Sequence, residues 1–214
     1  MTKQSRQIIT VLFFLIAVAS NASPPMLLQI DGIEIAVPIR ECTVNTFLQR
    51  SILYEPIDVV RDGLPWFGTR RDDWRSGVRI RKHMGLDFYS DTIVVVAAGD
   101  GVVTAVGRGK QWGGSITIDH GDSIATMYLH ISEWMTYIGA AVKRGDVIGE
   151  IFQPEGNAYQ TQLHWSLLKN GKFIDPLPLI RRTHRDNKTI QTILQEFDRT
   201  KQNRLQRRDS LMSQ

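Results

Sequence analysis

The sequence is poor in cysteine: Cys42 is the only one among 214 residues. One cysteine cannot close a disulfide within the chain, so the stability of the fold must come from packing and, where present, from bound metal. The sequence also lacks a Gly-x-Ser-x-Gly segment, the sharp turn that presents the nucleophile of many serine hydrolases. These absences argue against a disulfide-stapled scaffold and against serine or cysteine hydrolase chemistry.

Long hydrophobic runs are absent as well, since none reaches the roughly 20 residues that cross a bilayer. The apolar run at residues 8–19 is shorter, follows Lys3 and Arg6, and ends in small residues up to Ala22. That arrangement is typical of a secretory signal peptide. We therefore expect a signal peptide over residues 1–22, export to the periplasm or the extracellular space, and no transmembrane anchor after cleavage.

Strong charge of one sign is the third absence, because the formal net charge is only +4. This mild excess fits anionic wall polymers, membrane surfaces or nucleic acid, and it does not choose among them. With 42% hydrophobic residues, the chain can bury one ordinary core and one small appendage. Two full enzyme domains are excluded.

Short β-rich runs separated by glycine-containing turns occupy residues 63–180. Such spacing predicts a mostly β domain built on an antiparallel sheet. The expected strands cover residues 92–98, 101–106, 115–119, 124–129, 147–152 and 163–168.

The flanking segments differ from this central domain. Residues 23–62 are interpreted as an accessory segment with a β-hairpin, because Asp31-Gly32 lies between two apolar, β-branched runs. In the segment 181–214, apolar residues recur at helical spacing from Ile190 to Phe197. We expect a basic amphipathic helix over about residues 188–207.

Two short motifs bring together residues that can bind metal. His83 and Asp87 are four residues apart, and Gln162 and His164 are two apart. Even spacing in an extended chain puts both members of a pair on one face. Two imidazoles and a carboxylate are a ligand set that zinc accepts, with the fourth position left to water. A pair of this kind can equally be a hydrogen-bonded structural pair, so spacing alone does not decide.

The surrounding motifs add a family resemblance. In chain order they are Phe67-Gly68-Thr69-Arg70, His83-Met84-Gly85-Leu86-Asp87, the alanine- and glycine-containing run 95–103, Ile118-Asp119-His120-Gly121, Tyr128-Leu129-His130-Ile131-Ser132, the run 142–149, and Asn170-Gly171-Lys172-Phe173-Ile174-Asp175-Pro176. Together they resemble the lysostaphin-type zinc endopeptidases, which hydrolyse peptidoglycan. The resemblance covers residues 64–179 and implies the antiparallel β fold of that family, the duplicated hybrid motif.

The resemblance also implies roles for individual residues. His83, Asp87 and His164 would be the ligands of one Zn²⁺ per chain, and His130 would assist the zinc-bound water as a catalytic histidine. His120 would be structural or lie behind the ligands, and His184 falls outside the match. The family's second ligand motif is His-x-His, whereas this chain has Gln162 at the first position. Glutamine can orient water or donate a hydrogen bond, but it cannot carry a proton at neutral pH.

Two functional hypotheses follow. The first is a secreted zinc metalloendopeptidase that cuts peptide cross-links of peptidoglycan, with no nucleic-acid partner. The second is a catalytically weak or inactive module on the same fold that binds the wall or regulates a cell-wall amidase. Retention of all three ligands favours the enzyme, and Gln162 favours the alternative.

Overall fold

A computed structural model describes residues 26–38, 66–72, 80–89, 94–108, 113–151 and 162–213. The predicted signal peptide and Cys42 lie outside these ranges. In the part of the chain that is described, no helix is long and apolar enough to cross a membrane.

The largest element is a nine-stranded sheet in which every strand pair is antiparallel. One path through it runs β10-β7-β8-β9-β11-β6, and β12 adds β5 and β13 to β9. The expected antiparallel, mostly β fold is confirmed. The strands are β5 (Leu86–Tyr89), β6 (Val94–Val96), β7 (Gly101–Gly107), β8 (Gly114–Asp119), β9 (Ile124–Trp134), β10 (Ala141–Val142), β11 (Val147–Ile151), β12 (Gln162–Lys169) and β13 (Lys172–Ile174).

Strand β9 pairs with two different strands along one of its edges. Its first half, residues 124–129, pairs with β12, and its second half, residues 131–134, pairs with β11. Between the halves, the register against β8 slips by one residue at His130. An extra residue of this kind is a β-bulge, which bends the strand and re-aims a side chain. Sequence analysis ended this strand at residue 129 and therefore missed the bulge and the change of partner.

The N-terminal hairpin is formed as expected. Strands β1 (Leu27–Ile30) and β2 (Ile33–Ala36) pair around a turn in which Asp31 and Gly32 both have positive φ. This is the conformation that Asp-Gly accepts at low cost. Leu28, Ile30 and Ile35 are buried in the same core cluster as the large sheet. A second two-stranded pair is formed by β3 (Arg70–Asp72) and β4 (Ile80–Lys82).

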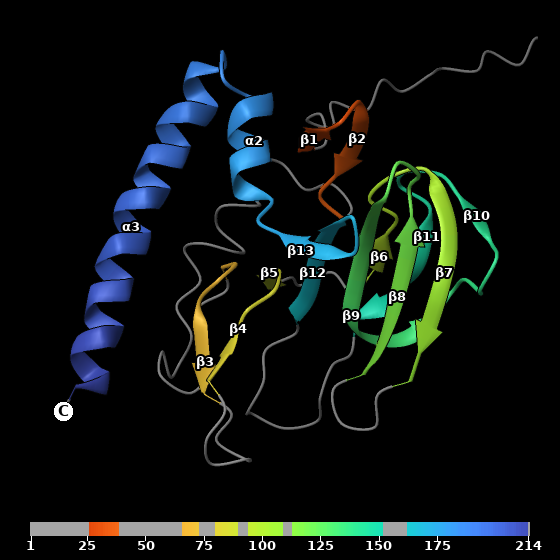
Figure 1. The fold of residues 1–214 in the computed structure, drawn as a ribbon, viewed down its shortest axis with the longest axis horizontal. Coiled ribbons are helices and arrows are strands. Elements are labelled where there is room, and N and C mark those ends of the chain that lie inside the picture. The colour runs from red at the N-terminus through yellow and green to blue at the C-terminus, as the bar shows by residue number, and fades with distance from the viewer. Residues whose placement is uncertain are drawn as a thin grey trace, which may run out of the picture.

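Two helices end the chain: α2 (Leu177–Thr183) and α3 (Lys188–Met212). The predicted C-terminal helix is confirmed and extends beyond residue 207, whereas α2 was not predicted because it is only seven residues long. The Asn187 side chain caps the start of α3 by accepting a hydrogen bond from the Ile190 N–H. Both helices lie on the side of the molecule opposite β7 and β10 (Figure 1).

Candidate metal centre

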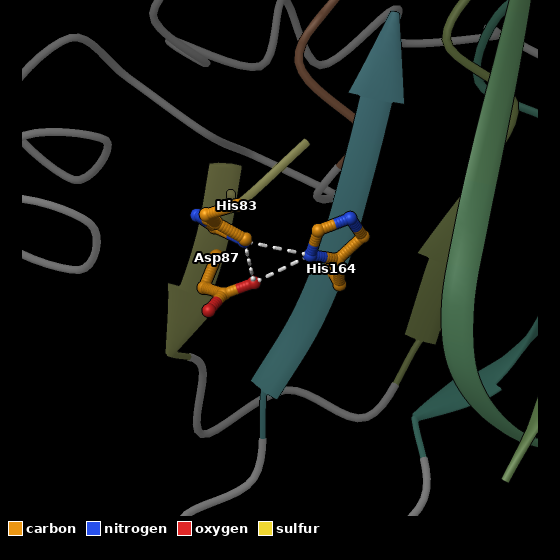
Figure 2. A group of neighbouring side chains, drawn as sticks. All are labelled: His83, Asp87 and His164. Carbon is orange, nitrogen blue, oxygen red and sulfur yellow. Dashed lines mark hydrogen bonds and ion pairs between the residues drawn. The ribbon is translucent and has the colours of Figure 1, made fainter. Parts of the chain in front are cut away.

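His83, Asp87 and His164 meet at the edge of the large sheet where β5 pairs with β12. His83 follows β4, Asp87 lies within β5, and His164 lies within β12. Asp87 and His164 are directly paired across the two strands. All three residues are buried, and Asp87 has no exposed surface. Figure 2 shows the three side chains pointing toward one another between the strands.

The three facing atoms form a small triangle. His83 Nε2 is 3.1 Å from Asp87 Oδ1 and 2.8 Å from His164 Nδ1, and the Asp87 to His164 edge measures 2.9 Å. These are the only three residues of the described ranges that offer such a group of His, Cys, Asp and Glu donors.

A hydrogen bond on the outer side of each imidazole orients the two rings of this triangle. His83 Nδ1 is 2.9 Å from the Trp66 carbonyl oxygen, which can only accept. The Nδ1 proton is therefore donated outward, and in the neutral ring the Nε2 lone pair faces inward. His164 Nε2 is 3.0 Å from the Ser166 hydroxyl, and a proton on Nε2 leaves the Nδ1 lone pair facing inward as well.

These donors fit a zinc ion. Two imidazole nitrogens and a carboxylate oxygen are ligand types of catalytic zinc sites. Bonds of 2.0–2.1 Å at tetrahedral angles separate the donors by about 3.3 Å, and the observed separations are 2.8–3.1 Å. A small outward movement would accommodate the ion. Since a buried carboxylate facing inward lone pairs is costly without a positive charge, a cation at the centre would stabilise the cluster.

Gly85 allows the two strands to approach at this point. A Cβ added to Gly85 would lie 2.8 Å from His164 Nε2 and 2.9 Å from Ser166 Oγ, and it would also collide with the Trp165 carbonyl. Any larger side chain at position 85 would therefore displace His164. Close packing against β12 therefore explains why a glycine lies between the first two predicted ligands.

His130, the predicted catalytic histidine, lies beside the triangle. Its ring centroid is 6.4 Å from that of His164, and the rings are nearly perpendicular. His130 occupies the bulge of β9 and has a φ of 68°, a left-handed conformation that non-glycine residues rarely adopt. It directly follows Leu129, the β9 partner of His164. Backbone strain of this kind persists where the surrounding structure enforces it, often at functional sites.

Gln162 begins β12, and its backbone pairs with Tyr89 of β5. It is two residues from His164 in the same strand, as predicted.

The other two histidines are elsewhere. His120 Nδ1 donates to the Asp100 carbonyl, and Nε2 lies 2.8 Å from Thr126 Oγ1. Thr126 also contacts the hydroxyl of Tyr128, which accepts a hydrogen bond from the Ala98 N–H. Burial lowers the pKa of His120, against the opposing effect of its bond to Asp100. His120 is therefore a structural residue, whereas His184 donates from Nε2 to the Leu27 carbonyl and ties the end of α2 to β1.

Sequence reasoning missed the two outer partners of the histidines. Ser166 could have been found, because strand alternation puts it on the same face as His164. The Trp66 contribution comes from a backbone carbonyl 17 residues before His83. No side-chain pattern marks such a group in a sequence.

Comparison with known proteins finds a peptidase family model that matches the part of the chain carrying the triangle. Residues 81–176 match the model of Peptidase family M23. This range contains all three residues of the triangle, together with His130 and Gln162.

Individual relatives match parts of the chain. Peptidoglycan DD-endopeptidase ShyC of Vibrio cholerae is 30% identical over 130 residues, which are 60% of this chain and 29% of ShyC. DD-carboxypeptidase/endopeptidase Mpg of Neisseria meningitidis is 32% identical over 98 residues, or 45% of this chain and 22% of Mpg. The chain thus spans less than a third of the length of either protein. Among solved structures, the catalytic domain of lysostaphin from Staphylococcus simulans superposes with a TM-score of 0.42 and 25% identity, covering 49% of this chain and 84% of that domain.

Proposed function

We propose that this chain, in which residues 81–176 match the model of Peptidase family M23, is a zinc metalloendopeptidase that hydrolyses peptide cross-links of peptidoglycan. The single observation that carries the proposal is the buried triangle of His83, Asp87 and His164, with both imidazoles oriented by outer hydrogen bonds. The relatives named for peptidoglycan endopeptidase activity support the substrate class.

In this proposal His83 Nε2, Asp87 Oδ1 and His164 Nδ1 hold one zinc ion. When bound, zinc supplies a Lewis acid that makes water nucleophilic near pH 7 and polarises a carbonyl group. The ligands contribute one negative charge, so the site with zinc bound would keep a net positive charge that polarises an amide carbonyl toward attack by water. The Trp66 carbonyl and the Ser166 hydroxyl keep both rings in the required orientation.

His130 is the proton carrier of this proposal. An imidazole ordinarily titrates near pH 6.5, so it can accept the proton released by the attacking water and return it to the departing amine. The bulge of β9 brings its ring to the side of His164. Hydrolysis then leaves a free carboxylate on one peptide and a protonated amine on the other.

Gln162 has a polarising or positioning role at most. Its amide can donate a hydrogen bond to a developing oxyanion but cannot exchange a proton. A histidine that supplied general acid–base help here would contribute a factor of roughly 10²–10⁴. Gln162 is also the observation that favours the second candidate function, a weakly active or inactive module that binds the wall or regulates an amidase.

Metal content combined with muropeptide digestion tests the proposal. The purified chain should bind about one zinc per molecule and release cross-linked peptides, and His164→Ala should do neither. A chain that takes up no zinc would contradict the proposed site. Zinc binding without cleavage, followed by a large gain of activity in Gln162→His, would favour the non-catalytic alternative.

The predicted signal peptide over residues 1–22 supports the proposal that this activity lies outside the cytoplasm. In this proposal the enzyme works in the periplasm or the extracellular space, where its substrate lies. Fractionation of cells that produce the full chain tests the location, and cleavage after Ala22 should be seen in the mature N-terminus.

A further inference from the structure

The contacts that orient the His83 ring continue through Trp66 to the C-terminal helix α3. The carbonyl oxygen of Trp66 accepts hydrogen bonds from His83 Nδ1 at 2.9 Å and from the hydroxyl of Thr69 at 2.8 Å, and a longer one of 3.4 Å from the Thr69 N–H. The two short bonds use both lone pairs of the oxygen. The position of this single carbonyl therefore decides where the His83 ring points.

Main-chain bonds connect the same segment to His83. The Gly68 N–H donates to the His83 carbonyl, and the His83 N–H donates to the Thr69 carbonyl, each at 2.8 Å. Gly68 has a φ of 78°, so the turn from Trp66 to Thr69 is tight. A shift of Trp66 would be transmitted to both the backbone and the ring of His83.

The indole of Trp66 is fixed by packing. It is fully buried, and its Nε1–H has no hydrogen-bond partner among the described residues. The Phe197 ring of α3 contacts it edge to face, with centroids 5.9 Å apart and planes at 88°. The Lys201 ammonium lies 5.8 Å from the centroids of both rings. Edge-to-face and cation–π contacts are directional, so they hold an aromatic ring in one place.

Phe197 is a core residue of α3, with only 2% of its surface exposed, and it belongs to the same core cluster as Trp66. Figure 1 shows α3 along the side of the molecule that carries β3 and β4, and His83 directly follows β4 in the chain. Residues from three separate parts of the chain thus form one line of contacts: Phe197 and Lys201, then Trp66, then His83.

We propose that Phe197 is a positioning residue of the metal centre: it holds the Trp66 indole, and through the Trp66 carbonyl it keeps His83 in the tautomer and orientation that present Nε2 to the metal. Helix α3 is then part of the working site, although it lies outside the residues matched to the peptidase family. This inference rests on the proposed zinc function.

The test compares Phe197→Leu with Ile190→Ala. Leucine keeps an apolar side chain but removes the ring edge. Ile190 is buried in the same helix seven residues earlier, about 10 Å along the axis, so its truncation weakens α3 packing without removing the Trp66 contact. Lys201→Met is the second variant, because Lys201 is only partly buried and its loss leaves the core intact.

Two measurements are made on each protein. Imidazole ¹⁵N shifts in the metal-free protein report the tautomer of His83, and titration with Co²⁺, which reports coordination by its absorption spectrum, gives the metal affinity. In Phe197→Leu the Nδ1–H form of His83 should lose its dominance, and Co²⁺ affinity should fall roughly tenfold, as for other outer partners of metal ligands. Lys201→Met should show a smaller loss of at most roughly fivefold.

Ile190→Ala should match the wild type in both measurements. Equal behaviour of Phe197→Leu and the wild type, or equal losses in Phe197→Leu and Ile190→Ala, would overturn the inference. If the wild type binds no Co²⁺, the proposed zinc function fails, while the tautomer measurement still decides whether Phe197 orients His83.

Discussion

Two hydrogen-bonded clusters in this molecule, the buried triangle of His83, Asp87 and His164 and the network around the half-buried His120, use histidine in opposite ways. In the triangle of His83, Asp87 and His164, the outer ring nitrogens bond to protein acceptors and the inner atoms converge. Around His120, the network runs from the Asp100 carbonyl through Thr126 and the Tyr128 hydroxyl to the Ala98 N–H.

The difference lies in where the ring protons point. With His120 neutral, Tyr128 can donate to Thr126, Thr126 to His120, and His120 to Asp100, so every donor has an acceptor. In the triangle, His83 Nε2 has no proton to donate to Asp87 Oδ1 while Nδ1 donates to the Trp66 carbonyl, and His164 Nδ1 has none while Nε2 donates to Ser166. Convergent lone pairs indicate a place for a cation, whereas a completed chain of donors and acceptors indicates a structural role.

The largest effect expected is loss of a ligand from the triangle. His164→Ala should abolish stoichiometric zinc binding and hydrolysis, because only two donors of the triangle, His83 Nε2 and Asp87 Oδ1, remain. The matched change is His120→Gln, which should retain zinc stoichiometry. Equilibrium dialysis followed by metal analysis measures the zinc content of both variants. Equal zinc uptake by the wild type and His164→Ala would contradict the assignment of the metal to the triangle.

Gly85→Ala should be nearly as severe. The added methyl group would lie 2.8 Å from His164 Nε2 and collide with a backbone carbonyl that cannot move freely. Overpacking typically costs about 1–3 kcal/mol of unfolding free energy, and here it should also weaken zinc binding. Gly171→Ala is a control, because its Cβ would meet nothing within 4 Å although its φ of 70° adds backbone strain. Urea unfolding and zinc affinity of the two variants should show that only Gly85→Ala loses metal.

Ser166→Ala should have an intermediate effect on the metal alone. It removes the outer partner of His164 Nε2, and loss of such partners lowers metal affinity about 10–100-fold. Ser166→Thr, which retains a hydroxyl, should restore part of the affinity. Competition with a zinc chelator gives both values, and an unchanged affinity in Ser166→Ala would show that the hydroxyl does not orient the ring.

Tyr128→Phe should affect stability without affecting the metal. It removes the buried acceptor of the Ala98 N–H and breaks the His120 network, which should cost about 1–3 kcal/mol of unfolding free energy. Denaturant unfolding checks the loss, and Co²⁺ titration should give the wild-type affinity. A weakened metal site in this variant would mean that the two histidine groups are coupled.

The smallest effect concerns pH. Burial lowers the pKa of His120 below its ordinary value of 6.5, so the unfolded chain takes up a proton more readily than the folded one. This contribution to stability is complete above about pH 6.5 and is lost as the pH falls below it. Unfolding of the metal-free protein between pH 7.5 and 5 should show this decline, and His120→Gln should show less of it. An equal decline in both proteins would assign it to other groups.

Much of the fold was predictable because the local sequence preferences for strands and turns agree with the tertiary structure at these positions. Six expected strands correspond to β6, β7, β8, β9, β11 and β12, since glycine-bounded β-branched runs mark them. The bulge at His130 could not be predicted, because it results from β9 changing partners, which is a tertiary event. Helix α2 has only one buried pair of apolar residues and therefore no legible period.

The convergence of His83, Asp87 and His164 was expected from the motifs that carry the family resemblance, because metal ligands must have particular side chains. Their supports were not: the Trp66 carbonyl belongs to the backbone, and Phe197 acts from 114 residues beyond His83 through another ring. The position of His120 in a completed network also required the structure.

The most direct test is a crystal structure of the zinc-loaded protein with anomalous data collected at the zinc absorption edge. The account predicts one anomalous peak per chain within bonding distance of His83 Nε2, Asp87 Oδ1 and His164 Nδ1, with both outer hydrogen bonds retained. A peak at other residues, or a zinc-free triangle in crystals that hold zinc elsewhere, would contradict it.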